Sequence, residues 1–211
     1  MSDFREIERK TFRAARDDGL LDVMMAAFVS MFALAPLWSE ALGDFWSSAV
    51  FGPIWFAGYL VVRYLRTHVV TPRLGSMEPG IPRRQRIRRA GIVMTVVLLI
   101  AYVVGVAAAQ GFGSDWFDLA ELVYPLTLGL TALIVFSLTG YSLSVWRYYL
   151  YGVLVAIAPL IGEWLWQNDL ASHHGYPVAF GSVAVIMLTA GIARLLTIIR
   201  DHPLPADPQA I

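Results

Sequence analysis

Six long apolar stretches account for most of the 211-residue chain. A helix that crosses the hydrocarbon core of a bilayer needs about 20 largely apolar residues. Backbone amides in that core must be paired within the protein, and continuous apolar runs are typical of helices, because barrel strands alternate over about ten residues. The sequence therefore predicts an all-α, six-transmembrane-helix bundle. The predicted spans are Leu20–Trp38, Ser48–Leu65, Ala90–Ala109, Leu119–Thr139, Val145–Trp166 and Pro177–Ile199.

Composition agrees with a membrane protein and excludes several kinds of site. Apolar residues make up 57% of the chain and charged residues 15%, against about 45–50% and about 25% in soluble domains. The absence of cysteine excludes disulfides, thiolate nucleophiles and cysteine-ligated metal centres. The sequence has no phosphate-binding loop, nucleophile elbow or dinucleotide fingerprint. We therefore expect a protein that is not an enzyme and holds no cofactor.

The segment from Arg63 to Arg89 predicts how the chain crosses the membrane. It carries eight arginines and one acid, Glu78. If the spans alternate from a cytoplasmic N-terminus, all sixteen basic residues of the chain fall on the cytoplasmic side with nine acids, and the other side has seven acids and no base. Basic residues in short loops favour the cytoplasm. We expect both termini inside, in a multi-pass protein of the cell inner (cytoplasmic) membrane.

Three parts follow one another along the chain. Residues 1–18 are predicted to form a cytoplasmic amphipathic arm, either on the inner membrane surface or as a solvated helix with internal charge pairs. Residues 19–200 are the six-helix membrane domain, which includes a basic cytoplasmic loop at 66–89. Residues 201–211 contain three prolines and no periodicity, which predicts a disordered cytoplasmic tail.

Three of the ionisable residues within the predicted spans could pair with one another. Asp22 lies one turn into the first, Arg147 opens the fifth, and Arg194 lies near the end of the sixth. Arginine side chains can extend to the headgroups, and this is the simpler interpretation of both. The short stem of Asp22 cannot, so we expect it to pair with Arg194 or Arg147. Such a pair either tethers the first helix or belongs to a proton or cation relay, and the tether is the simpler interpretation.

The sequence also indicates two charged surfaces. Arg83, Arg84, Arg86, Arg88 and Arg89 are expected to contact anionic headgroups of the inner leaflet, or an acidic partner. Nucleic acid is not an expected partner, because no nucleic-acid-binding fold pattern accompanies this short segment.

The second charged surface lies on the opposite side, where His173 and His174 accompany Asp169 and Glu163. These could bind a metal, but adjacent histidines diverge on a regular backbone. Exposed loop polarity is the default interpretation, and no metal site is predicted.

Small residues recur at helical spacing in two spans. Small side chains let membrane helices approach closely, within the chain or against a partner subunit. The predicted packing residues are Ala26, Ser30 and Ala33 in the first span, and Gly152, Ala156 and Gly162 in the fifth.

Three short motifs lie where the spans meet the cytoplasmic side. They are Asp18-Gly19-Leu20-Leu21-Asp22, Val70-Thr71-Pro72-Arg73-Leu74-Gly75, and Gly140-Tyr141 with Arg147-Tyr148-Tyr149 and Tyr151-Gly152. Together they resemble a family of small six-span prokaryotic membrane proteins. The resemblance implies the six-span fold and no particular activity. It also draws attention to a cytoplasmic-face cluster of Asp18, Asp22, Pro72, Arg73, Gly75 and Arg147.

Two functions agree with these features. The first is a non-enzymatic accessory or scaffold subunit that packs against other membrane proteins, or against copies of itself. The alternative is a small transport component or substrate-binding membrane subunit. A cavity lined by Asp22, Thr127, Thr131 and Glu163 would favour transport, whereas a solid bundle with an exposed small-residue face would favour a scaffold.

Overall fold

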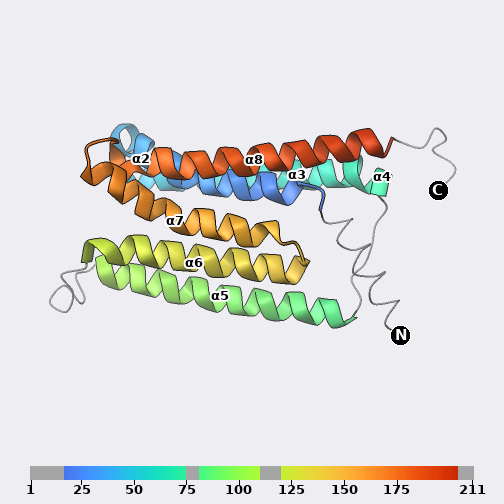
Figure 1. Ribbon diagram of the computed structural model, residues 1–211, viewed down its shortest axis with the longest axis horizontal. Helices are drawn as coiled ribbons and strands as arrows, with labels where there is room; N and C mark the ends of the chain where they lie inside the picture. The colour runs from blue at the N-terminus through green and yellow to red at the C-terminus, as the bar shows by residue number, and fades with distance from the viewer. Residues whose placement is uncertain (1–16, 75–80, 110–119, 204–211) are drawn as a thin grey trace. The chain divides into compact units, whose positions relative to one another are not determined.

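The computed structural model describes residues 17–74, 81–109 and 120–203, and these are helical with short turns between the helices (Figure 1). The α-helices are α2 (Leu20–Ala49), α3 (Phe51–Leu65), α4 (Thr71–Leu74), α5 (Ile81–Ala109), α6 (Ala120–Leu143), α7 (Arg147–Gln167) and α8 (Tyr176–Asp201). A π-helical turn, η1 (Arg66–Val70), joins α3 to α4, and a 3₁₀ turn, η2 (His173–Gly175), precedes α8.

Six helices in the described part of the chain are long and apolar enough to cross a membrane. The prediction of an all-α chain with six such helices is therefore confirmed. The candidate spans are Leu20–Ser39, Phe45–Leu74, Arg84–Val104, Pro125–Leu143, Arg147–Gln167 and His173–Asp201.

The helices extend further than the apolar runs do. Helical backbone continues from α3 through η1 and α4 to Leu74, and α5 already begins at Ile81. Much of the stretch 66–89, which was expected to be a loop, is therefore helical. Pro82 explains the early start of α5, since proline in the first turn has a fixed φ and no amide that needs a partner. The predicted arm up to residue 16, the segment 75–80 with Gly75, and the tail from residue 204 lie outside the described residues.

Two compact units divide the chain. Unit 1 comprises Met1–Pro79 and Ala184–Ile211, and unit 2 comprises Gly80–Val183. Their boundary falls within α8, so each unit is described by itself.

Unit 2 is built on close contact between α6 and α7. A Cβ atom on Gly129 of α6 would lie 2.5 Å from the backbone oxygen of Ala156, and one on Gly152 of α7 would lie 3.0 Å from Cβ of Phe136. A larger residue at Gly129 would have to displace backbone, and one at Gly152 would require Phe136 to move by a few tenths of an ångström. Helix α5 packs beside α6.

Unit 1 pairs α2 with α3 through larger side chains. The rings of Trp38 and Phe51 stack with 5.3 Å between their centroids, and Phe28 meets Trp55 edge-on at 6.4 Å. The second half of α8 approaches the start of α2. There Gly19 adopts a left-handed φ of 77° and lies directly against the backbone oxygen of Gly191.

Candidate functional site: a charged clip and an apolar groove in unit 1

Asp18 joins the start of α2 to the end of α3. Its Oδ1 accepts a hydrogen bond of 3.1 Å from the amide of Leu20, which caps the first turn of α2. Its Oδ2 accepts hydrogen bonds from Nε and Nη2 of Arg66, at 3.2 and 2.9 Å. The Asp18 side chain is fully buried, whereas that of Arg66 is 35% exposed. Because a buried carboxylate is stable only when it is paired, this ion pair holds the two helix ends together.

A second ion pair joins the start of α2 to α8. Arg194 Nη1 lies 2.8 Å from Asp17 Oδ2. The glycine contact between Gly19 and Gly191 lies close to these two residues in sequence on both helices, so α8 is held against α2 by charge and by close backbone approach. We call the ion pairs Asp18–Arg66 and Asp17–Arg194 the charged clip.

Asp22 lies one turn further along α2 and is fully buried. Its Cβ lies 3.0 Å from where a Cβ on Gly191 would be, so it faces α8 close to Arg194. Arg194 itself pairs with Asp17. The pairing of Asp22 with an arginine stays a prediction.

The turn after α3 carries the rest of the cluster that the motifs suggested. At the end of η1 the hydroxyl of Thr71 donates a 2.8 Å hydrogen bond to the carbonyl of Arg66, five residues earlier. Arg73 donates from Nη1 to the carbonyl of Val69 at 2.6 Å, and Pro72 lies beside it in α4. Short π-helical segments are frequent at functional sites. Here the segment begins at the arginine that binds Asp18.

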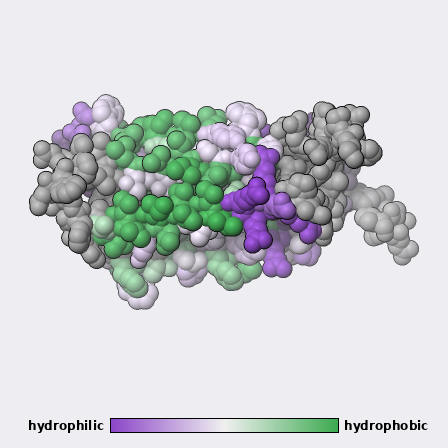
Figure 2. All heavy atoms as spheres, turned by 90° about the horizontal axis from the view of Figure 1, so that it is seen from below, coloured by the Kyte–Doolittle hydropathy of each residue, from purple (hydrophilic) through white to green (hydrophobic). Residues whose placement is uncertain are grey.

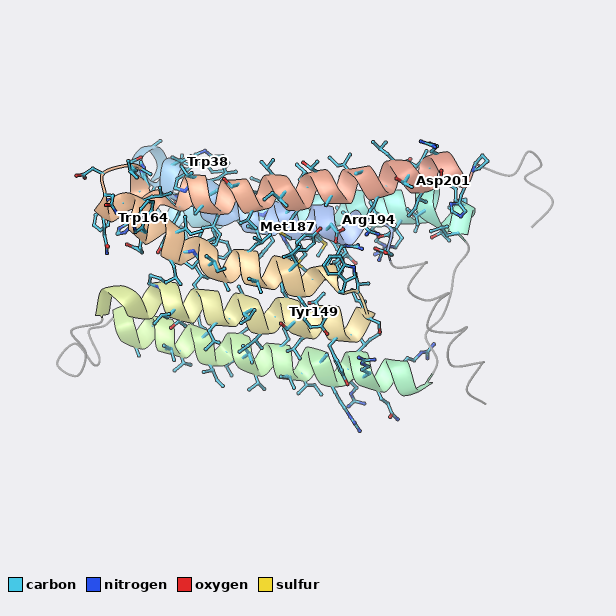
Figure 3. The ribbon with its side chains drawn as sticks, in the orientation of Figure 1. Trp38, Tyr149, Trp164, Met187, Arg194 and Asp201 are labelled. Carbon is cyan, nitrogen blue, oxygen red and sulfur yellow. The ribbon has the colours of Figure 1, made fainter. Side chains whose placement is uncertain are left out.

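An apolar groove of about 400 Å³ runs between α2 and α3 and begins beside the charged clip. Leu20 and Leu65 lie at its clip end, while Trp38 and Phe51 line its far end. In Figure 3 Trp38 is labelled toward one end of the helices of unit 1, and Arg194 is labelled well away from it, in the direction of Asp201. The lining is Leu20, Val23, Met24, Ala27, Ser30, Met31, Leu34 and Trp38 of α2, Phe51, Ile54, Trp55, Gly58, Val61, Val62 and Leu65 of α3, and Ile192 and Leu195 of α8.

Arginines gather at one end of unit 2 as well. Arg86, in the early turns of α5, places its guanidinium carbon 3.6 Å from the centroid of the Tyr141 ring at the end of α6. Arg84, Arg88 and Arg89 are exposed, and the side chain of Arg83 lies outside those the structure describes. The guanidinium carbon of Arg147 lies 5.2 Å from the Tyr148 ring.

Arg147 departs from its simpler interpretation. Only 5% of the residue is exposed, so its guanidinium lies inside the protein and does not extend outward to the headgroups. Both Arg147 and the fully buried Tyr148 make polar or ring contacts there.

The opposite end of unit 2 holds Glu163 between two rings. Tyr176 donates a 3.0 Å hydrogen bond to Oε1 of Glu163, and Nδ1 of His174 lies 3.1 Å from the same oxygen. His173 and His174 both have left-handed φ angles, 55° and 54°, which turn the chain from α7 into α8. The backbone of Gly175 contacts Gly162, which explains why both positions are glycine. Within the described residues, no group of three or more potential ligands could hold a metal ion.

Several hydroxyl groups on the apolar helices bond to their own backbone. Thr95 donates to the Gly91 carbonyl at 3.0 Å, and Thr189 to the Val185 carbonyl at 2.8 Å. Such bonds leave little hydroxyl polarity for a solute. The same pattern holds for Ser30, Thr139, Ser142, Ser182 and Thr197.

The structure thus places the predicted site residues in different surroundings. Asp18, Asp22 and Arg194 lie in unit 1, Arg147 lies in unit 2, and Gly75 is outside the described residues. Ala26 and Ala33 are buried on α2, and Ser30 lines the groove.

The sequence analysis did not predict that Asp17 and Arg66 would belong to a candidate site. The charge bias already placed both residues on the same membrane side, and this signal could have identified them as candidates. The groove also has a sequence signal, because Leu20, Met24, Ala27, Met31, Leu34 and Trp38 recur at alternating spacings of four and three residues.

No protein-family model, curated protein or solved structure matches this chain, so its function has to be inferred from these residues and their geometry.

Proposed function

We propose that the chain is a multi-pass protein of the cytoplasmic membrane and acts as a non-enzymatic accessory or scaffold subunit. In this proposal both termini face the cytoplasm. Its membrane helices pack against another membrane protein, and the arginines of α5 contact anionic headgroups of the inner leaflet.

The distribution of charge within each unit supports this topology. In unit 1 the charged clip brings the start of α2 together with Arg66 and Arg194. In unit 2 the Arg86–Tyr141 contact brings the start of α5 to the end of α6, and the close approach of Gly140 to Tyr149 places the start of α7 there too. Each unit therefore has one end rich in arginine, as the positive-inside bias requires for the cytoplasmic side.

The exposed apolar face of α5 is the observation that carries the proposal. Of the span Arg84–Val104, only 6% is buried within the protein. Ala90 is buried and Met94, Val97 and Ala101 are partly covered, at the spacing of one helix face, while most other side chains of the span are exposed. Figure 2 shows this side of the molecule as mainly hydrophobic, with hydrophilic residues gathered toward one end. The exposed side chains are mostly large and apolar, such as Ile92, Leu99 and Val103, and are not the small residues that were expected at a scaffold surface. Such a face can lie against lipid or against a partner helix within the bilayer, and the proposal assigns it to a partner helix.

The polar groups favour a scaffold over the transport alternative. Transport was expected to use a cavity lined by Asp22, Thr127, Thr131 and Glu163, and the groove of unit 1 is lined by none of these residues. The groove is apolar, and the hydroxyl of Ser30 in its lining bonds to the backbone oxygen of Ala27. Such a groove offers a polar solute few partners for the hydration that it would lose.

Site-directed photo-crosslinking in the membrane tests the proposal. A photoreactive amino acid replaces Val96, on the exposed face of α5, in the full chain. We expect a discrete protein adduct that co-purifies in mild detergent at a fixed stoichiometry. The matched control replaces Met94, two residues away and partly covered, and should give little intermolecular adduct. Adducts with lipid alone at Val96 would contradict the proposal.

A further inference from the structure

The groove between α2 and α3 has the dimensions of a hydrocarbon chain. Its lining on α2 extends from Leu20 to Trp38, which corresponds to about 27 Å at a rise of ~1.5 Å per residue. A space of about 400 Å³ drawn out over that length is narrow. A compact solute would fill only part of it, whereas a flexible chain could follow it along the helices.

The two ends of the groove are chemically different. At the far end, the stacked rings of Trp38 and Phe51 form part of its lining. At the near end Val62 and Leu65 are followed by Arg66, which lies one turn beyond Val62 on nearly the same side of the helix. The Arg66 side chain keeps 35% of its surface exposed while it binds Asp18. An occupant with an apolar chain and an anionic head would match both ends.

We propose that this groove binds one acyl chain of an anionic phospholipid, with the lipid phosphate beside Arg66. The acyl chain lies along Ala27, Gly58 and Val62, where side chains are small or β-branched, and it ends against the Trp38–Phe51 stack. Guanidinium groups favour phosphate because they offer several donors in a planar fork. The proposal requires the membrane location of the chain but does not depend on which protein covers α5.

Gly58 is the position at which the proposal can be tested most cleanly. A Cβ on Gly58 would meet no atom within 4 Å, and Gly58 lines the groove. We therefore expect a leucine side chain at this position to extend into the groove. Gly52, on the same helix, also has nothing within 4 Å but does not line the groove. Gly58→Leu and Gly52→Leu are thus a matched pair of variants.

The probe is a phosphatidylglycerol with a diazirine on one acyl chain, present as a minor component of phosphatidylcholine nanodiscs that hold the full chain. After irradiation, mass spectrometry locates the adducts. We expect adducts on the groove residues of α2 and α3 at a yield about tenfold above that on the exposed face of α5, a preference equivalent to ~1.4 kcal/mol. Gly58→Leu should reduce the groove adducts to the α5 level, and Gly52→Leu should leave them unchanged.

Several results would overturn the proposal. These are equal labelling of the groove and of α5, labelling that survives Gly58→Leu, and equal labelling by the corresponding phosphatidylcholine probe. A photoreactive residue at Val62 that cross-links to a second copy of the chain, without lipid adducts, would also overturn it. Ala27→Leu introduces a larger side chain from the opposite wall of the groove. If either Gly58→Leu or Ala27→Leu fails to fold, the labelling of the other variant still tests the proposal. Elution of each variant from size-exclusion chromatography establishes that it is folded.

Discussion

The pair α6–α7 and the pair α2–α3 both contain glycines, but they use them in opposite ways. Gly129 and Gly152 bring α6 and α7 so close that a Cβ atom would meet backbone or a neighbouring Cβ. A Cβ atom on Gly52 or Gly58 of α3 would meet no atom within 4 Å, and α2 and α3 leave a groove between them. The pair α6–α7 is held by close backbone contact, and the pair α2–α3 by the ion pair Asp18–Arg66 at one end and the stack of Trp38 on Phe51 at the other.

This difference shows that a glycine in a membrane helix does not by itself indicate close packing. Glycine allows a neighbouring backbone to approach, but whether one does depends on the facing residues. Ala156 and Phe136 face the glycines of unit 2, whereas large side chains such as Trp55 and Phe28 keep α2 and α3 apart. The contrast leads to four predictions, from the largest expected effect to the smallest.

Asp18→Ala should destabilise the chain most, because α2 and α3 depend on the clip. The change removes a helix cap and leaves Arg66 without its buried carboxylate, for an expected loss of about 3 kcal/mol. The free energy of unfolding in mixed micelles measures it. Asp201→Ala is the control, since Asp201 lies 3.6 Å from Arg200 in an exposed pair, and should cost less than ~0.5 kcal/mol. Equal losses in the two variants would mean that the clip does not hold α2 to α3.

Gly129→Leu should destabilise unit 2 by roughly 1–3 kcal/mol, since the new side chain must displace the Ala156 backbone. The same unfolding measurement applies, with Gly52→Leu as control. If both leucine variants were equally stable, α6 and α7 would not be as close as described.

Arg86→Gln should weaken the attachment of α5 to α6 by about 0.5–1 kcal/mol, because it removes the cation–π contact with Tyr141. Arg88→Gln, which removes the same charge from an exposed position of α5, should have a smaller effect. A larger loss in Arg88→Gln would show that charge number, and not the ring contact, sets the stability there.

Gly58→Leu should change the stability least. A Cβ atom at this position meets nothing within 4 Å, and leucine favours a helix over glycine. The free energy of unfolding should therefore stay unchanged or rise by no more than ~1 kcal/mol. A clear loss of stability would indicate that α2 and α3 close upon each other and that the groove does not persist.

The sequence predicted the six long apolar helices, because the length of an apolar run decides whether a helix could cross a bilayer. Several helices extend beyond the predicted spans, and much of the expected loop at 66–89 is helical, since polar residues such as Arg88 and Arg89 do not break a helix and Pro82 favours the start of one. The Gly80-Ile81-Pro82 pattern was a usable signal for the start of α5. Apolar length alone could not reveal that the helix continues beyond the apolar run.

The sites were less predictable because they depend on pairing between distant residues. Asp17, Asp18 and Asp22 are near neighbours, and nothing local shows that Asp18 binds Arg66, 48 residues away, while Asp17 binds Arg194. The groove likewise arises from the mutual placement of two helices. The burial of Arg147 could not be predicted either, since an arginine at the edge of a span can be exposed or buried.

The central claim is that the arginine-rich ends of both units face the cytoplasm. The chain has no cysteine, so single cysteines can be placed without background at Thr67 in unit 1, Gln85 in unit 2 and Ser172 at the opposite end of unit 2. In intact cells, a membrane-impermeant maleimide should label Ser172→Cys and should label Thr67→Cys and Gln85→Cys only after the membrane is opened. Labelling of Thr67→Cys or Gln85→Cys in intact cells, with Ser172→Cys protected, would contradict the account.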